Sequence, residues 1–419
     1  MRILHILHQY LPEKVGGVEL YTRTLARQQV KQGHKPAIFT PAAHDPHWPQ
    51  PQLEDGVRVY RVPVGKREAT AVFRSNFHNP ALVDAYKQVQ QREHPHLVHL
   101  QHLMGLPWQL VQTITAPLVM TLHDYWYLCA NAQLITNYDN TVCQGPKAWL
   151  NCAHCALARV GRPQALPLIP VLAPLFGYRH WQLRRIWQQA HTLIAPSQFT
   201  AGIYRQMGIA ACKIEVIPHG IQVPTTLPAR QPHAGLHIAY IGGLSWQKGV
   251  HLLVAAVNQL PHTGVRLSIF GDTAVFPDYA AQLQQQAAHP GIVFHGRLPH
   301  EQLWHTLADI DLLVHPTLWY ETSSLIIQEA LAARVPVLAS HIGAIQERLR
   351  DGVDGFYFPP GDEHALLALL RRFVNEPMLV DQLRSGIRPV TTMAQHLEMV
   401  TAVYQKATHP PHQPDTSPS

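Results

Sequence analysis

Long apolar runs are absent from the 419-residue sequence. A helix needs roughly 20 predominantly apolar residues to cross a bilayer, and no stretch approaches that length. The first residues, MRILHILHQYLP, hold one Arg and a short apolar stretch but no small-residue cleavage site. This pattern favours a first β-strand over a signal peptide. We therefore expect a protein that stays in the cytoplasm.

Charged residues are scarce too. They make up 14% of the chain against 46% hydrophobic residues, which is typical of a folded, soluble protein. Lys and Arg nevertheless exceed Asp and Glu to give a net charge of +6, and 29 His add positive charge as the pH falls. A basic balance suits anionic partners such as sugar nucleotides, phospholipid surfaces or nucleic acid, and it fits a functionally neutral surface as well. Nothing beyond net charge favours nucleic acid, and we expect none as a partner.

Cysteine is rare, but four of the five cysteines lie close together in the sequence, at Cys129, Cys143, Cys152 and Cys155. Disulfides are disfavoured in the cytoplasm. The closing C-x2-C pair has the spacing of a metal knuckle, and four thiolates can complete a tetrahedral structural zinc site. The irregular gap before Cys152 keeps four unrelated thiols open as the alternative, and an iron–sulfur cluster is a further one. Cys212 lies outside the group and is expected to be buried.

Short apolar runs alternate with helix-like stretches along the chain. A strand at 3–7 precedes a helical pattern from about Val18 to Gln32, and further strands are predicted at 36–41, 57–63, 96–102, 117–124, 192–197 and 213–220. After a Pro-rich stretch the pattern restarts, with strands predicted at 238–241, 265–272, 292–296, 310–316 and 335–341. Such alternation predicts doubly wound parallel sheets, whose ligands bind at the carboxyl ends of the strands.

The two halves predict two α/β domains, at residues 1–217 and 218–390, and the first carries a Cys-rich insertion at about 125–190. A helix at 391–407 is expected to pack back on the first domain, and the Pro/Ser-rich tail at 408–419 is expected to be disordered. Inside the insertion, a helix would cluster Trp181, Arg184 and Arg185 on one turn. Such a segment can lie on an anionic membrane surface, or it can be an ordinary helix with a solvated basic face.

The strongest chemical signal is the segment WYETSSLIIQEALAARVPVLAS at 319–340. Glu321 precedes an expected helix start, where free N–H groups and the helix dipole suit phosphate or sugar oxygens. Glu329 lies about two turns further in, roughly 12 Å along the helix axis. An unpartnered carboxylate is costly in such an apolar stretch, so the two glutamates can hold two parts of an extended ligand. The plain alternative for Glu321 is a first-turn charge that the helix dipole favours.

The spacing of these two glutamates, followed by a small-residue helix, resembles the second domain of glycosyltransferase family 4, also called group 1. Further stretches occur in the order of that family: VGGVE (15–19), HDYWYLC (123–129), APSQF (195–199), VIPHGI (216–221), YIGGLSWQKG (240–249), IFGD (269–272), FHGRLPHEQL (294–303) and VHPTLWYE (314–321). The resemblance spans about residues 1–407. It implies the GT-B fold, in which two Rossmann-like domains face each other across a donor and acceptor cleft.

The resemblance also implies an activity. We expect a retaining, metal-independent transferase that moves a sugar from a nucleotide diphosphate sugar to a glycan or lipid-linked acceptor. Its setting would be the synthesis of cell-surface polysaccharides or glycoconjugates, in the cytoplasm, with peripheral contact at the inner face of the membrane as a further expectation. The resemblance also implies that catalysis requires no cofactor. A structural zinc held by the four cysteines would brace a lid over the acceptor cleft.

Carried over position by position, the resemblance implies roles for particular residues. His123, Lys248 and Glu321 are the catalytic candidates, with Lys248 on the donor diphosphate and the other two on the donor sugar. Glu329 would bind ribose hydroxyls. The remaining donor-binding candidates are Gly16, Gly17, Gly242, Gly243, Arg297, Thr322, Ser323, Ser324 and Leu325. No dedicated nucleophile is evident, so retention would proceed by front-face departure, with a diphosphate oxygen taking the proton of the acceptor.

One position departs from the pattern of the family. Gly243 stands where the family has an arginine, which removes one cation from the leaving diphosphate and can cost a few kcal/mol of barrier. Arg297, His219 and His295 are the candidates for replacing that charge. The departure keeps a second hypothesis open, a sugar-nucleotide-binding GT-B protein with weak or no transferase activity. A GT-B phosphorylase or epimerase is a third hypothesis, which no additional motif favours.

Overall fold

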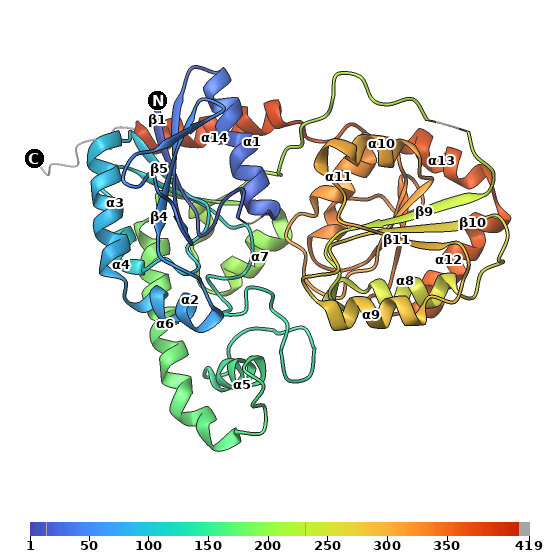
Figure 1. Ribbon diagram of the computed structural model, residues 1–419, viewed down its shortest axis with the longest axis horizontal. Coiled ribbons are helices and arrows are strands. Elements are labelled where there is room, and N and C mark those ends of the chain that lie inside the picture. Colours follow the sequence, from blue (N-terminus) through green and yellow to red (C-terminus); the bar gives the residue numbers. More distant parts are fainter. Residues whose placement is uncertain (14, 231, 410–419) are drawn as a thin grey trace, which may run out of the picture. The chain divides into compact units, whose positions relative to one another are not determined.

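The computed structural model describes residues 1–13, 15–230 and 232–409. They form two compact units, one of residues 1–220 with those from 393 onward and one of residues 221–392 (Figure 1). The sequence places these breaks at 217/218 and 390/391. Most of the tail expected to be disordered, from residue 410 onward, lies outside the described residues. No helix in the described part of the chain is long and apolar enough to cross a membrane.

The first unit is built on an eight-stranded sheet with the spatial order β3-β4-β2-β1-β5-β6-β7-β8. All neighbouring strands are parallel except β3 and β4. The central strand β1 pairs with β2 on one side and β5 on the other. The strands are β1 (Arg2–Ile6), β2 (Lys35–Ala42), β3 (Gln52–Glu54), β4 (Val57–Pro63), β5 (Leu97–Leu100), β6 (Leu118–Thr121), β7 (Thr192–Ala195) and β8 (Ile214–Val216).

Helices surround this sheet, and the last one comes from the far end of the chain. The helices are α1 (Gly17–Lys31), α2 (Ala69–Phe77), α3 (Pro80–Glu93), α4 (Trp108–Gln112), α5 (Leu150–Arg159), α6 (Ile169–Gln189), α7 (Gln198–Gln206) and α14 (Met393–Thr408). Buried polar contacts hold α14 on the unit, because the Tyr404 hydroxyl lies 2.6 Å from Nδ1 of His99 and the Tyr21 hydroxyl lies 2.8 Å from Nε2 of His396. The insertion between β6 and β7 contains α5 and α6 (Figure 1).

The second unit has a six-stranded, fully parallel sheet with the order β11-β10-β9-β12-β13-β14. Its strands are β9 (Leu236–Ile241), β10 (Val265–Phe270), β11 (Ile292–Gly296), β12 (Leu312–His315), β13 (Val337–Ser340) and β14 (Gly355–Phe358). Its helices are α8 (Val250–Val257), α9 (Pro277–Gln286), α10 (Leu303–Ala308), α11 (Leu325–Ala332), α12 (Glu363–Asn375) and α13 (Met378–Gly386).

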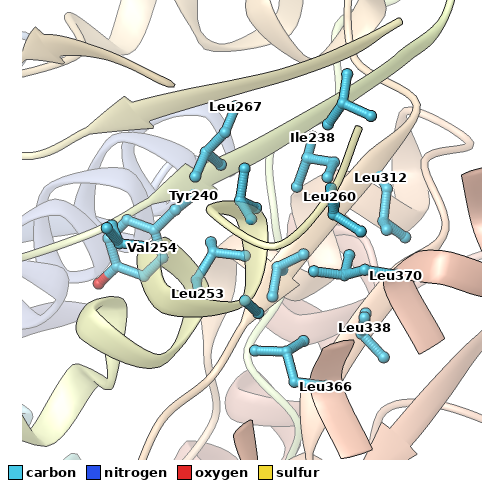
Figure 2. Close-up of a cluster of buried hydrophobic side chains, with 14 of the residues drawn as sticks. Ile238, Tyr240, Leu253, Val254, Leu260, Leu267, Leu312, Leu338, Leu366 and Leu370 are labelled. Carbon is cyan, nitrogen blue, oxygen red and sulfur yellow. The ribbon is translucent and has the colours of Figure 1, made fainter. Parts of the chain in front are cut away.

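The core of the second unit explains why its strands read as continuous apolar runs. A parallel sheet covered by helices buries both faces, so its strands need apolar side chains on both sides. On one face, Ile238 and Leu312 from the sheet pack with Leu253 of α8 and Leu366 of α12 (Figure 2). The opposite face is covered by a separate cluster that includes Ile327 of α11.

Both sheets place their first strand in the middle, so that the chain winds outward first to one side and then to the other. The loops at the carboxyl ends of β1 and β5, and of β9 and β12, therefore leave the sheet in opposite directions. In doubly wound sheets ligands bind at such a switch point. Each unit thus has one preferred position for a functional site.

Candidate functional site

In the second unit, the loops after β9 and β12 are bound to each other. The Leu318 amide donates to the Gln247 carbonyl at 2.8 Å, and the Thr317 hydroxyl donates to the same carbonyl at 3.2 Å. Gly249 permits this approach, because a Cβ at its position would lie 1.9 Å from the carbonyl oxygen of Pro316 and its φ is +69°. Only glycine fits there without strain. The two loops of the switch point therefore form one rigid platform.

This platform carries an ion pair between Lys248 and Glu321. Nζ of Lys248 lies 2.5 Å from Oε1 of Glu321. The indole N–H of Trp319 donates to the same oxygen at 2.8 Å, and Nε2 of His315 lies 3.5 Å away. The ammonium of Lys248 also stands 5.1 Å from the centre of the Trp319 ring. The structure thus brings together two of the three residues that the sequence identified as catalytic candidates.

The electrostatics of Glu321 follow from these contacts. The residue is 7% exposed, and burial alone would raise the pKa of its carboxyl. The positive charge of Lys248 and the hydrogen bond to His315 outweigh burial and hold the pKa far below its usual range. Glu321 is therefore a fixed negative charge at any physiological pH. The sequence did not predict His315 and Trp319 as partners, although both lie in the motif VHPTLWYE.

The helix N-terminus beside this pair has no side-chain cap. Ser324 occupies the N-cap of α11 with a left-handed backbone, φ +49°, and its side chain makes no capping hydrogen bond. Uncapped N–H groups and the helix dipole favour an anion at this point. The hydroxyl of Ser323 accepts from Nη2 of Arg348 at 3.1 Å. Arg348 is a second cation close to α11, and sequence reasoning missed it because it lies far downstream of the motif.

Glu329 lies on α11, near the middle of the helix. Among the described residues, no side chain forms a hydrogen bond or ion pair with its carboxylate, and the residue is only partly exposed. Burial raises the pKa of this carboxyl to about 7. A carboxylate kept in such surroundings without a partner from the protein is suited to accept hydrogen bonds from the hydroxyls of a ligand.

The glycine-rich loop after β9 starts with Gly242 and Gly243. The carbonyl oxygen of Gly243 accepts from the Tyr240 hydroxyl at 2.8 Å, which fixes the loop to the core. A Cβ at Gly243 would meet no atom within 4 Å, so this position is open toward solvent. Arg297 follows β11 and is exposed, with β10 between its strand and β9. His295 is another candidate for replacing the charge of the arginine that the family has at position 243. Its Nε2 atom lies 3.1 Å from Oγ of Ser268, and its ring stacks on Phe270.

In the first unit, Gly16 and Gly17 lie where α1 begins, after the carboxyl end of β1. A Cβ at Gly17 would meet nothing within 4 Å, so the backbone there can be approached closely by a ligand. Two residues on, Glu19 is 2% exposed, and burial raises the pKa of its carboxyl. Its Oε1 atom has no hydrogen-bond partner among the described residues. Glu19 is a polar group at the switch point of this unit to which the sequence analysis assigned no role.

His123 follows β6 and belongs to a buried network of histidines and polar groups. Its Nε2 atom lies 2.7 Å from Oε1 of Gln101, and its ring lies near Tyr21 and His219. Burial lowers the pKa of His123 to about 3, so the imidazole is neutral at physiological pH. His219 is thus in the first unit, within the His123 cluster.

The neighbouring residue, Asp124, is paired rather than free. Its Oδ2 lies 3.0 Å from Nε2 of His102, whose ring packs against that of His8 with centroids 4.2 Å apart. The His102 contacts outweigh burial and lower the pKa of the Asp124 carboxyl. The loops after β1, β5 and β6 therefore supply a connected row of polar side chains at the carboxyl edge of the sheet.

The four clustered cysteines share the insertion of the first unit. Cys152 and Cys155 lie on the first two turns of α5. The sulfur of Cys143 accepts from the Gly145 amide at 3.4 Å, and that of Cys155 accepts from the Asn137 amide at 3.2 Å. Backbone N–H groups that point at cysteine sulfurs would also suit thiolates.

No ligand set is formed in the structure, however. Across residues 1–13, 15–230 and 232–409, no group of three or more His, Cys, Asp or Glu side chains is arranged to hold a metal ion. Burial, reinforced by the other cysteines, raises the pKa of Cys152 to about 12 and that of Cys155 to about 11. The fifth cysteine, Cys212, is exposed, and its expected burial is wrong. It lies on a short surface turn at Ala211–Lys213 that buries no side chain.

A cavity of about 400 Å³ lies at the opposite edge of the second sheet, near the amino ends of β9 and β12. Its charged side chains already have partners, since Arg230 pairs with Asp311 and Arg384 pairs with Asp381. The switch point of the second unit is therefore the stronger candidate site. It has the Lys248–Glu321 pair, a helix start without a side-chain cap and, further along that helix, a carboxylate without a side-chain partner in the described part of the chain.

Comparison with known proteins agrees with the family resemblance found in the sequence. The family model described as Glycosyltransferase Family 4 matches residues 15–223, and the one described as Glycosyl transferases group 1 matches residues 235–376. Glycogen synthase from Mycobacterium tuberculosis is 26% identical over 388 residues, 90% of this chain and 87% of that protein.

Solved structures agree as well. Sucrose-phosphate synthase from Thermosynechococcus elongatus has a TM-score of 0.73 at 19% identity, covering 97% of this chain and 98% of that one. Anabaena HepE in complex with UDP and glucose has a TM-score of 0.66 at 18% identity, covering 97% and 100%. The fold is GT-B, which confirms the fold class expected from sequence.

The raised pKa of Glu329 makes the stability of the second unit depend on pH. The pKa of this carboxyl is higher in the folded protein than in the unfolded chain, so the folded state favours the protonated form. The resulting contribution to the free energy of unfolding is complete below about pH 4.5, and it is lost as the pH rises through about 7. We expect Glu329→Gln to remove this loss. Relative to the wild type, the variant should gain about 2 to 3 kcal/mol of unfolding free energy between about pH 5 and about pH 8.

Urea unfolding at the two pH values measures this difference, and the matched control is Glu301→Gln, which changes an exposed carboxyl. The control should follow the wild type at both pH values. A Glu329→Gln variant whose stability also runs parallel to the wild type would show that the carboxyl is solvated, contrary to the assignment.

Proposed function

Because the chain belongs to glycosyltransferase family 4, group 1, and is a glycosyltransferase, we propose that it transfers a sugar from a nucleotide diphosphate sugar to a glycan or lipid-linked acceptor with retention of configuration. The observation that carries this proposal is the Lys248–Glu321 pair beside the uncapped start of α11. These groups supply a cation, a fixed carboxylate and the N–H groups of a helix start without a side-chain cap, while Glu329 lies further along the same helix.

Each group matches one part of the donor. The ribose hydroxyls would donate to the Glu329 carboxylate, and the α11 N-terminus, from Thr322 to Leu325, would face the diphosphate. Lys248 has three N–H donors and uses one on Glu321, so the others are available to diphosphate oxygens. Glu321 would accept from hydroxyls of the transferred sugar. In the first unit, the open backbone at Gly17 and the neutral imidazole of His123 offer further contacts.

Retention would follow without a nucleophile from the protein. Glu321 already accepts hydrogen bonds from two donors, and its low pKa makes it a weak nucleophile and a weak base. The bond between the anomeric carbon and the diphosphate oxygen breaks, the acceptor oxygen attacks from the same face, and its proton passes to the departing diphosphate. Charge on that group would be neutralised by Lys248 and α11, so that no metal ion is required.

The choice of donor and acceptor rests on analogy. HepE is described in complex with UDP and glucose, which makes UDP-glucose the first donor to test. A panel of nucleotide sugars can be ranked by thermal shift, because a bound donor stabilises the folded protein by mass action. The role in cell-surface polysaccharide or glycoconjugate synthesis and the cytoplasmic location stay predictions.

We expect Glu321→Gln to lower kcat/KM for donor turnover about a hundredfold or more, since the variant loses a charge preorganised beside the reacting sugar. The thermal shift caused by UDP alone should persist, because Glu329 and α11 are intact. Steady-state release of UDP from UDP-glucose and acceptor measures the first effect, with Glu301→Gln as the matched control. Wild-type turnover by Glu321→Gln would refute the assigned site.

The second candidate function, donor binding with weak transfer, is favoured by Gly243. We expect Gly243→Arg to raise kcat/KM by about tenfold, because the open space at this position admits a side chain whose charge can reach the diphosphate. Gly243→Gln adds similar length without charge and should leave the rate near that of the wild type. A fall in the rate with arginine alone would mean that another cation already occupies this space.

The structural zinc stays a prediction. If it is correct, protein purified without oxygen should contain about one zinc per chain, because a closed four-thiolate site holds its metal tightly. Elemental analysis decides the question, and Cys152→Ser/Cys155→Ser should remove the metal while Cys212→Ser retains it. Zinc and iron well below one per chain in the wild type would leave four unrelated thiols.

A further inference from the structure

Helix α6 exposes a stripe of large apolar side chains to solvent. Val171, Leu175, Tyr178 and Trp181 are 71%, 37%, 47% and 51% exposed. Their spacing of three or four residues places them on one face of the helix. We refer to these four residues as the exposed stripe. The opposite face of α6 is buried in the first unit, through Ala173, Phe176, Leu183, Ile186 and Trp187.

A helix that is apolar on two faces is unusual in water. A surface helix ordinarily has one apolar stripe toward the core and polar residues opposite. The short turn before α6, Leu166–Leu168, adds two more exposed apolar side chains, since Leu166 and Leu168 are 54% and 47% exposed. In Figure 1, α6 and the neighbouring α5 reach away from the sheet of the first unit, so the helix is not a cover for that sheet along its whole length.

The stripe continues directly into basic residues. Arg184 and Arg185 are exposed at the carboxyl-terminal end of the stripe. The Arg185 guanidinium stands 5.0 Å from the centre of the Trp181 ring, and the Tyr178 ring stacks on Trp181 with centroids 5.9 Å apart. Aromatic rings with a polar end and arginines beside them are the side chains that prefer the headgroup level of a bilayer.

The charge of the segment around α6 indicates which kind of partner the exposed stripe can bind. Residues 140–214 contain no Asp or Glu and eight Lys or Arg. The rest of the chain holds 25 Lys or Arg against 27 Asp or Glu, so this segment alone accounts for the positive balance of the protein. A surface that combines exposed apolar side chains with positive charge of one sign complements an anionic lipid layer.

We infer that this face of α6 docks on an anionic phospholipid surface, with the exposed stripe at the boundary between headgroups and acyl chains and with Arg184 and Arg185 at lipid phosphates. The helix lies on the bilayer and does not cross it, in line with the absence of a spanning helix among the described residues. This inference does not depend on the identity of the donor or acceptor, and it can hold even if the proposed transferase activity fails.

Co-sedimentation of the full chain with vesicles tests it. We expect binding to phosphatidylcholine–phosphatidylglycerol vesicles that exceeds binding to phosphatidylcholine alone and that weakens with salt. Arg184→Glu/Arg185→Glu should weaken binding to the mixed vesicles by at least about thirtyfold, because each basic residue near an anionic surface contributes about a factor of five. Tyr178→Ser/Trp181→Ser should weaken it by about tenfold or more, because it removes the inserted apolar area.

Matched controls separate this surface from general effects. Phe276→Ser removes an aromatic side chain that is 49% exposed in the second unit, and Arg371→Glu reverses an exposed charge there. Both should bind like the wild type, and circular dichroism checks that every variant is folded. Equal binding by all variants, or no binding by the wild type, overturns the inference. So does a wild-type dimer that Tyr178→Ser/Trp181→Ser makes monomeric, because a second copy then covers the stripe.

Discussion

An ionised carboxylate is costly to bury without a partner, and the paired carboxylate of Glu321 is the central constraint on the site of the second unit. Removing one partner from a buried ion pair leaves a costly uncompensated charge, so the loops that carry Lys248 and Glu321 must keep their mutual position. The close approach of Gly249 to Pro316 and the hydrogen bonds from the 317–318 segment to Gln247 hold them there. The start of α11, which follows Glu321 in the chain, has no side-chain cap.

The first unit uses burial for a different purpose. Its histidines His5, His99 and His123 are buried, and burial lowers the pKa of each. Hydrogen bonds with Gln29, Gln101 and the α14 residue Tyr404 satisfy these rings without adding charge. His123 can therefore orient a hydroxyl but cannot act as a cation. In the proposed mechanism, the cations for the departing diphosphate are those of the second unit, so the glycine at position 243, where the family has an arginine, bears on the expected rate.

Much of the fold and of the candidate site was predictable from the sequence, and the parts that were missed have physical reasons. The apolar runs predicted the strands, because the strands of a parallel sheet are buried on both faces. The motifs that follow these runs predicted the loops of the site, because ligands bind at the carboxyl ends of such strands. The motif order also pointed to Lys248 and Glu321, 73 residues apart, although their direct contact needed the structure. His315, Trp319 and Arg348 were missed as neighbours, since their contacts arise from loop geometry, which has no period in the sequence. Cys212 was misplaced because cysteine is usually buried, whereas here it lies on a surface turn.

The position of the charges along the chain says more about possible binding partners than the net charge does. The positive balance of the chain suggested a sugar nucleotide, a lipid surface or nucleic acid without distinguishing them. The candidate donor site contributes little to that balance, since the charge of Lys248 is offset by Glu321. The excess is carried by residues 140–214, around a helix whose outer face is apolar and aromatic. A diphosphate is recognised by a few positioned donors, whereas a lipid surface is recognised by a broad field and by apolar area. The distribution of charge in this chain therefore supports the proposed donor site at the ends of β9 and β12 and the proposed lipid-binding face on α6.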